Sequence, residues 1–187
     1  MIEFIQFCQQ TYQLDPTLAH ELLKNSKTKT FKKGEYILKK GDVCRHLFFI
    51  NKGFAKICFV NNDKEFNMQF FAEHRVFTVF DSYLTQTPSN FMLIALENTN
   101  ITLIPQKDVE KLCQQHHGIE TFLRKLISVA TIRMMKRISE SLEENATKRY
   151  NQFVKENHKI VQRISLGNLS NYLGITQQSL SRIRAKK

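Results

Sequence analysis

The stretch that decides the fold of the C-terminal part is SLGNLSNYLGITQQSLSRIR, residues 165–184. Its first half places leucines at helical spacing on one face, namely Leu166, Leu169 and Leu173. Ser170 is small where a second helix must approach, and Gly174 can adopt the left-handed conformation that ends a helix. Thr176 can then cap the next helix. The spacing predicts two helices packed across a tight turn.

The second of these helices turns Leu180 and Ile183 inward and leaves a polar side outward. Arginine can pair bidentately with guanine and glutamine with adenine, which suits a helix that enters the major groove of DNA. The predicted base contacts are Gln177, Gln178, Ser181 and Arg182. An ordinary helical hairpin with a solvated polar face is the alternative interpretation.

Positive charge is concentrated in the same part of the chain. The formal net charge is +11, and residues 145–187 carry nine Lys or Arg against one acid, Glu156, which makes that segment +8. Charge alone would also suit an anionic membrane surface, but its placement favours a phosphate-rich partner. The predicted phosphate contacts are Thr176, Ser179, Arg184, Lys186 and Lys187.

The composition, at 42% hydrophobic and 24% charged residues, is that of a folded protein rather than a disordered one. No apolar run approaches the roughly 18 residues of a membrane span, and the start lacks the basic stretch of a signal peptide. We therefore expect no membrane partner and a cytoplasmic location.

The cysteines and histidines give no sign of a metal or a cofactor. The four cysteines have no CxxC spacing, so we interpret them as small core residues rather than redox or cluster ligands. A jelly-roll enzyme of the cupin kind would need clustered metal ligands, and the strand region offers only His46 and His74. We expect neither a metal, a cofactor nor an enzymatic activity.

Residues before position 106 predict two short helices and then many strands. Asp15 and Pro16 supply an N-cap and a first-turn proline for the second helix. From about Ser26 to Pro105, short apolar or alternating runs indicate a sandwich or jelly-roll barrel. Residues 61–63, Asn-Asn-Asp, predict a hairpin turn, and the strand after it should bury one alternating face: Phe66, Met68 and Phe70.

A long helix is expected from near Gly118 to Asn145. A second stripe, Phe122, Leu126 and Val129, covers only its first half, so this half should pack on the barrel while the later half keeps one apolar seam. We predict that a partner helix covers that seam in a homodimer, and a core helix packed on its own barrel is the alternative. The seam residues are Leu123, Ile127, Ala130, Met134, Ile138 and Leu142.

The sequence resembles the Crp/Fnr superfamily of bacterial transcription regulators over essentially its full length. Residues 172–176 with 180–183 are similar to the DNA-reading motif of that family, and residues 31–35, 41–42 and 48–53 look like the opening strands of a cyclic nucleotide-binding domain. The resemblance implies an α+β protein with a β jelly-roll sensor-like domain (1–115), a dimerisation helix (116–145) and an all-α helix-turn-helix DNA-binding domain (146–187). The sequence departs from the family after Arg184, where only three residues follow, so we expect a reduced or absent wing.

The family's cyclic-nucleotide pocket rests on a Glu that binds ribose and an Arg that binds the cyclic phosphate. The resemblance puts Val79 and Ser89 at these two positions, with Asn90 beside the second, so cyclic AMP is not the expected ligand. Arg75 is the candidate substitute for the missing arginine. Iron–sulfur sensing is not expected either, because the N-terminal segment holds only Cys8.

The function that the sequence predicts is a homodimeric transcription regulator whose C-terminal modules bind an inverted-repeat operator. The remaining candidate partners are a small-molecule effector of unknown identity and RNA polymerase. A ligand-binding or protein-interaction module, with a helical tail that does not contact DNA, is the alternative function.

Overall fold

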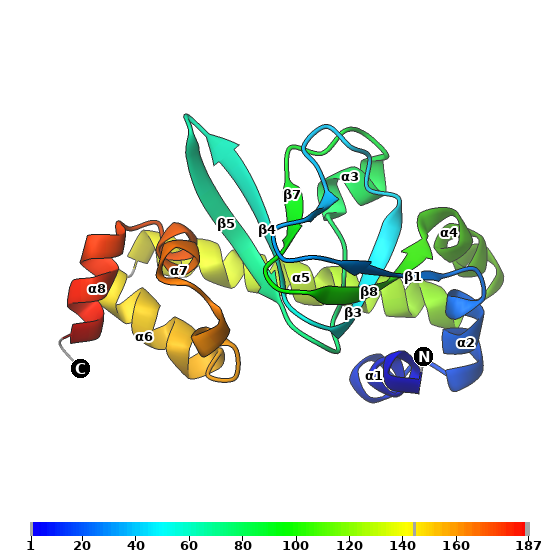
Figure 1. Cartoon of the computed structure of the whole chain (residues 1–187). Helices are drawn as coiled ribbons and strands as arrows, with labels where there is room; N and C mark the ends of the chain where they lie inside the picture. The colour runs from blue at the N-terminus through cyan, green and yellow to red at the C-terminus, as the bar shows by residue number, and fades with distance from the viewer. Residues whose placement is uncertain (1, 144, 186–187) are drawn as a thin grey trace. The chain divides into compact units, whose positions relative to one another are not determined.

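The computed structural model describes residues 2–143 and 145–185 of the chain (Figure 1). These residues form two compact units. The first consists of Met1–Ile57 and Phe70–Val129, and the second consists of Cys58–Gln69 and Ala130–Lys187. The second unit therefore contains the outer part of a β-hairpin together with the C-terminal helices.

Two short helices open the chain, as the sequence predicts: α1 (Ile2–Tyr12) and α2 (Pro16–Leu23). Asp15 caps α2, because its Oδ1 accepts a hydrogen bond from the backbone N–H of Thr17 at 2.7 Å. Pro16 takes the first helical position, where the missing N–H costs nothing.

The predicted jelly-roll barrel is confirmed. Its strands form two four-stranded sheets, in the orders β1-β8-β3-β6 and β2-β7-β4-β5. In Figure 1, strands β1, β8 and β3 of the first sheet lie side by side, and their ladders are antiparallel. The strands are β1 (Lys27–Phe31), β2 (Tyr36–Leu38), β3 (His46–Lys52), β4 (Ala55–Asn61), β5 (Lys64–Phe71), β6 (Val76–Phe77), β7 (Met92–Ala95) and β8 (Thr99–Pro105).

Aromatic rings fill much of the core of the first unit. Phe49 is fully buried, and the ring of Phe4 meets it edge-on at 5.3 Å between centroids. The turn between β3 and β4 depends on Gly53, whose φ is +112°. A Cβ at Gly53 would lie 2.6 Å from the Cα of Thr99, so both conformation and space require glycine.

The β4–β5 hairpin shows one confirmed prediction and one that is confirmed only in part. Asn62 and Asp63 form the turn with φ of 47° and 57°, as a tight hairpin requires. The predicted inner face is confirmed only at Phe70, which is buried, because Phe66 and Met68 are half-buried whereas Asn67 is completely buried. The amide of Asn67 donates to a backbone carbonyl 101 positions later in the chain, so a polar contact buries it.

Three short elements of the first unit and one edge strand were not singled out by the sequence patterns. They are α3 (Phe80–Thr85), α4 (Gln106–Gln115), β6 and β1. Strand β1 pairs only with β8 among the described strands, and four of its five residues are exposed. An edge strand of this kind has no buried face and so no alternation to detect.

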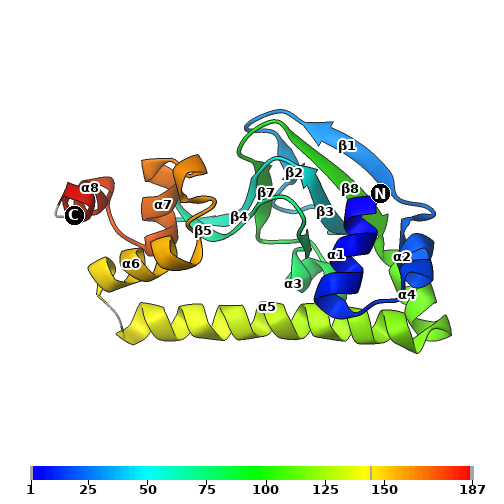
Figure 2. The ribbon, with the colours of Figure 1, turned by 90° about the horizontal axis from the view of Figure 1, so that it is seen from below.

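The predicted long helix is confirmed as α5 (His117–Glu143). Its first half packs within the first unit, where Phe122 and Leu126 are buried and Phe122 meets the ring of Tyr12 edge-on at 5.1 Å. Figure 2 shows this half of α5 beside α4, from which it continues directly.

The second unit carries the predicted helical pair. After α6 (Ala146–Glu156) and a 3₁₀ turn at Val161–Arg163 come α7 (Leu166–Leu173) and α8 (Gln177–Ala185), which pack together in Figure 2. The small core of these elements consists of Tyr150, Phe153, Ile164, Leu169, Leu173 and Leu180.

Candidate nucleic-acid interface

The turn between α7 and α8 has the geometry that the sequence predicts. Gly174 ends α7 in the left-handed conformation, with φ of 69°, and the N–H of Ile175 donates to the carbonyl of Ser170 at 3.1 Å. Thr176 caps α8, because its Oγ1 accepts from the N–H of Ser179 at 3.1 Å. These local contacts fix the direction in which α8 leaves α7.

The side chains of α8 divide into an inner and an outer set. Leu180 is fully buried and Ile183 is half-buried, whereas Gln178, Ser181 and Arg182 are exposed. Gln178 and Arg182 are four residues apart and therefore lie about one helical turn from each other on one side. Three of the four predicted base contacts thus lie on the solvent side of α8.

The fourth, Gln177, is exposed as well, but its amide lies close to the preceding helix. Its side chain is exposed, but a Cβ built at Gly167 would lie 3.2 Å from its Nε2. The amide of Gln177 therefore lies against the first turn of α7, at a point where α7 has no side chain. Part of its polar surface is turned toward the protein.

The predicted phosphate contacts also differ among themselves. The hydroxyls of Thr176 and Ser179 are hydrogen-bonded to each other at 3.0 Å. Arg184 is exposed, with its guanidinium 6.0 Å from the centroid of the Tyr150 ring. Lys186 and Lys187 lie outside the described residues.

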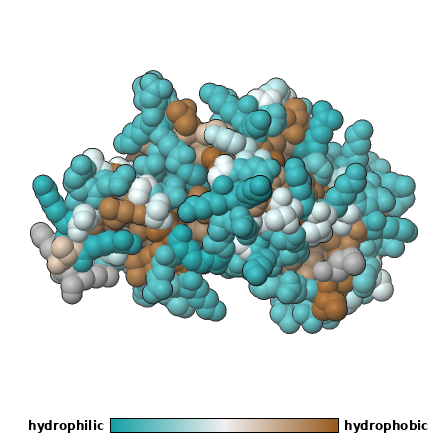
Figure 3. All heavy atoms as spheres, in the orientation of Figure 1, coloured by the Kyte–Doolittle hydropathy of each residue, from teal (hydrophilic) through white to brown (hydrophobic). Residues whose placement is uncertain are grey.

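Hydrophilic residues cover most of the face of the molecule visible in Figure 3, with separate smaller hydrophobic patches. Polar character alone therefore does not distinguish α8 from the rest of the surface. Its distinguishing feature is that an exposed amide and an exposed guanidinium share one side of a helix held by a capped turn.

The second half of α5 exposes large apolar side chains. Met134, Ile138 and Leu142 of the predicted seam are 56%, 50% and 81% exposed, whereas Leu123, Ile127 and Ala130 are half-buried. Ile132 and Met135 are exposed as well, and the sequence reasoning missed them because it followed a single stripe. At about 100° per residue, the five exposed residues occupy one continuous arc of the helix.

The four residues predicted to line a ligand pocket in the barrel do not share one environment. Val79 and Ser89 are buried, whereas Arg75 and Asn90 are exposed. Ser89 is held within the fold, since its Oγ accepts from the N–H of Phe91 at 3.0 Å. The ligand pocket stays a prediction.

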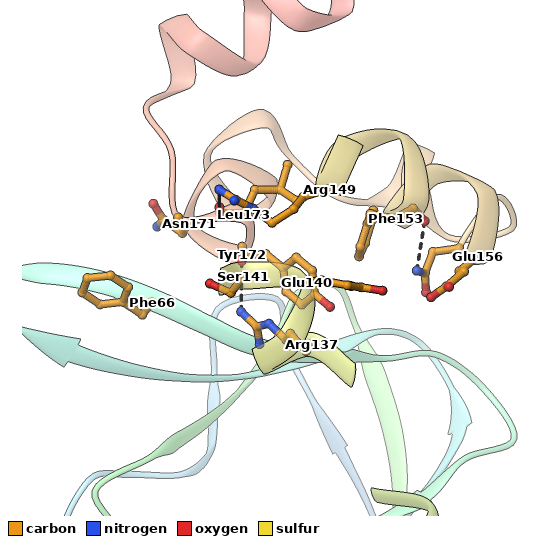
Figure 4. Close-up of a pocket in the computed structure, with 12 residues that line it drawn as sticks. Phe66, Arg137, Glu140, Ser141, Arg149, Phe153, Glu156, Asn171, Tyr172 and Leu173 are labelled. Carbon is orange, nitrogen blue, oxygen red and sulfur yellow. Dashed lines mark hydrogen bonds between the residues drawn. The ribbon is translucent and has the colours of Figure 1, made fainter. Parts of the chain in front are cut away.

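A cavity of about 240 Å³ with both polar and apolar lining residues lies within the second unit (Figure 4). Arg137 enters it from α5, and Tyr172 and Phe153 approach it from α7 and α6, with their rings 4.8 Å apart between centroids. Burial raises the pKa of the Tyr172 hydroxyl, and the nearby Arg137 opposes that rise. The sequence patterns did not single out Arg137, because one arginine on a helix rich in basic residues gives no signal.

Within the described ranges, no three His, Cys, Asp or Glu side chains gather as metal ligands would. None of the helices described has both the length and the apolar character needed to cross a bilayer.

Comparison with known proteins agrees with this architecture. Residues 28–116 match the family model of the cyclic nucleotide-binding domain, whereas no curated protein matches the sequence. FixK2 from Bradyrhizobium japonicum has a similar structure, with a TM-score of 0.78 at 15% identity over 86% of this chain and 83% of that one.

Two further solved structures resemble the chain over nearly all of its length. One is a protein from Eubacterium rectale described as a transcriptional regulator of the Crp/Fnr family, with a TM-score of 0.75 at 15% identity over 95% of this chain and 85% of the other. The second is CLP from Xanthomonas campestris, a global regulator described as responsive to c-di-GMP, with a TM-score of 0.70 at 15% identity over 92% and 91%. Residues 28–116 therefore match a cyclic nucleotide-binding domain, and the chain as a whole has the fold of the Crp/Fnr transcription regulators.

Proposed function

We propose that this chain is a homodimeric bacterial transcription regulator that binds an inverted-repeat operator through α8. The observation that supports this most is the exposed side of α8, where Gln178 and Arg182 lie one turn apart beyond a capped turn. In this role the protein acts on DNA in the cytoplasm and catalyses no reaction.

In the proposed complex, α8 enters the major groove. Gln178, Ser181 and Arg182 contact base edges, and Gln177 contributes through the part of its amide that faces solvent. Arg184, Lys186 and Lys187 contact phosphates together with the Thr176 and Ser179 hydroxyls, which supplies affinity without sequence choice.

The exposed apolar arc of α5 supports the homodimer. Monomeric proteins seldom leave several large apolar side chains together in water, and a second copy of the same helix would bury Met134, Ile138 and Leu142. Two-fold symmetry of the pair then requires two half-sites of opposite direction in the operator.

In this proposal, residues 1–115 form the sensor-like domain, 116–145 the dimerisation helix and 146–187 the DNA-binding domain. A small-molecule effector of the barrel must bind one arrangement of the dimer better than another, since equal affinity would shift nothing. Cyclic AMP is not the proposed effector, because Val79 and Ser89 supply neither a carboxylate nor a guanidinium. RNA polymerase is the further protein partner that a regulator implies.

Selection of bound sequences from a random DNA pool tests the proposal. We expect recovery of an inverted repeat with half-site centres about 10 base pairs, or one helical turn, apart. Gel-shift titrations over a salt series should then give a steep fall of affinity with salt. No enriched sequence together with no salt-dependent binding would instead favour a protein-interaction module.

A further inference from the structure

One arginine of α5 joins three segments of the second unit. Arg137 donates from Nη1 to the carbonyl of Met68, and from Nη2 to the carbonyls of Asn67 at 2.8 Å and Tyr172 at 2.9 Å. Its guanidinium carbon also lies 4.1 Å from the centroid of the Tyr172 ring. Figure 4 shows Arg137 beside Tyr172 at the edge of the cavity. The side chain of Arg137 therefore connects strand β5 to the end of α7.

This placement disfavours the charged form, because burial lowers the pKa of the Arg137 guanidinium. Hydrogen bonds from a charged group to carbonyls offset such a penalty only when several are made in good geometry. The planar guanidinium can serve carbonyls that point at it from different segments, which a lysine ammonium cannot match. The site is thus built for arginine.

Asn67 makes a second connection between the same strand and the same helix. Its side chain is completely buried, and its Nδ2 donates to the carbonyl of Asn168 at 2.8 Å. Asn168 lies in the first turn of α7 and Tyr172 in the last, so the pair Asn67–Met68 is tied to both ends of this helix. We call these contacts the Arg137 joint, comprising Arg137, Asn67, Met68, Asn168 and Tyr172.

The cavity beside the joint invites a ligand interpretation, but polar groups of its wall are already engaged by the protein. Glu156 accepts hydrogen bonds from Lys136 and Gln152, and Arg149 donates to the carbonyl of Leu173 at 3.1 Å. Both terminal nitrogens of Arg137 donate to backbone carbonyls. These hydrogen bonds indicate that the residues connect α5, α6, α7 and β5 rather than bind a ligand.

We propose that Arg137 is a positioning residue that fixes α7, and through the Gly174 turn α8, against the β4–β5 hairpin. Residues 58–69 of this hairpin belong to the same compact unit as the C-terminal helices, so the joint is the place where the hairpin contacts α7. This inference rests on the proposed function, because it gives the Arg137 joint the task of orienting α8 for contacts with bases.

Hydrogen–deuterium exchange of the full chain, followed by mass spectrometry, tests the joint without DNA. In Arg137→Met we expect peptides covering residues 64–69 and 166–173 to exchange faster by roughly tenfold or more, while β3 and β8 keep wild-type rates. Arg137→Lys keeps the charge and should give a smaller increase in both peptides. Arg133→Met removes an exposed arginine one turn earlier on α5 and should leave both peptides unchanged.

Wild-type exchange in both peptides of folded Arg137→Met would overturn the joint. So would an equal acceleration throughout the barrel, which marks a general loss of stability. If Arg137→Met does not fold, the same comparison in Arg137→Lys decides: faster exchange confined to the two peptides supports the joint, and wild-type rates overturn it.

Gel shifts with selected and random duplexes form the second arm. A positioning role predicts that Arg137→Met reduces the ratio of specific to non-specific affinity, by roughly tenfold, more than it reduces non-specific binding. An unchanged ratio would contradict that role. If the wild-type chain binds no DNA at all, the proposed function fails, while the exchange result still decides whether the joint exists.

Discussion

Helices α5 and α8 both expose side chains to solvent, but the exposed groups are of opposite kinds. On α5 they are the apolar Ile132, Met135 and Leu142, and on α8 they are the polar Gln178 and Arg182. Burial of an apolar surface against another apolar surface lowers the free energy, whereas amides and guanidinium groups need hydrogen-bonding partners. Under the proposed function these surfaces make two different contacts, one with a second copy of the chain and one with DNA, and each can be disrupted separately.

The largest effect is expected from a charge in the apolar arc of α5. Ile138→Glu should abolish the dimer at micromolar concentrations, because each of the two copies loses roughly 1.5–3 kcal/mol of apolar burial and gains a charge to desolvate. Sedimentation equilibrium measures the change. Arg133→Ala, on the opposite side of the helix, is the control and should remain dimeric. A dimeric Ile138→Glu protein would show that this arc is not the contact.

Removal of the Arg182 guanidinium should weaken DNA binding and leave the dimer intact. Arg182→Ala is expected to weaken operator binding by roughly 1–3 kcal/mol and to relax base choice at one position. Titrations of operator and random duplexes give the two affinities. Equal losses on both duplexes would contradict a base contact by Arg182.

A smaller and less selective effect is expected at the end of α8. Arg184→Ala should weaken operator and random DNA by the same factor and reduce the slope of log affinity against log salt by about one, as loss of a phosphate contact does. Gel shifts at four or more salt concentrations measure the slope. A loss confined to the operator would make Arg184 a base contact instead.

The smallest effect concerns the polar side of α5, where Lys136 pairs with Glu156 of α6. Burial alone would raise the pKa of Glu156, but the hydrogen bonds from Lys136 and Gln152 lower it below its ordinary value. The pair therefore stabilises the fold above the unfolded-state pKa of a glutamate, and this contribution is lost as pH falls through the lower folded-state pKa.

Melting temperatures measured against pH in wild type and Glu156→Gln check this expectation. The small difference between the two proteins should disappear at low pH and shrink in high salt, because the side chains of Lys136 and Glu156 are 49% and 40% exposed. A difference that persists in acid would assign the effect to packing rather than to charge.

The fold was predictable where the signals are local. Capping by Asp15 and Thr176, the left-handed Gly174 and the Asn62–Asp63 turn depend on neighbours within a few residues, so the sequence alone locates them. Strand β1 could not be located in this way, because Lys27–Phe31 is a mostly exposed edge whose partner lies far along the chain.

The candidate site was predictable only in part, for a related reason. The polar side of α8 follows from helical spacing, but the burial of Asn67 and the role of Arg137 depend on residues far away in sequence. No periodic pattern marks a side chain whose partners are backbone carbonyls. The closeness of the Gln177 amide to α7 could not be predicted either, since it depends on the absence of a side chain at Gly167 in the preceding helix.

The missing side chain at Gly167 places the adjacent Gln177 and Gln178 in different surroundings. Because Gly167 has no side chain, the Gln177 amide lies close to α7, whereas Gln178 is exposed on the side of α8 that it shares with Arg182. A methyl group at position 167 would push that amide outward by a few tenths of an ångström. Under the proposed function, a substitution at residue 167 could therefore change operator preference through Gln177 without altering the sequence of α8.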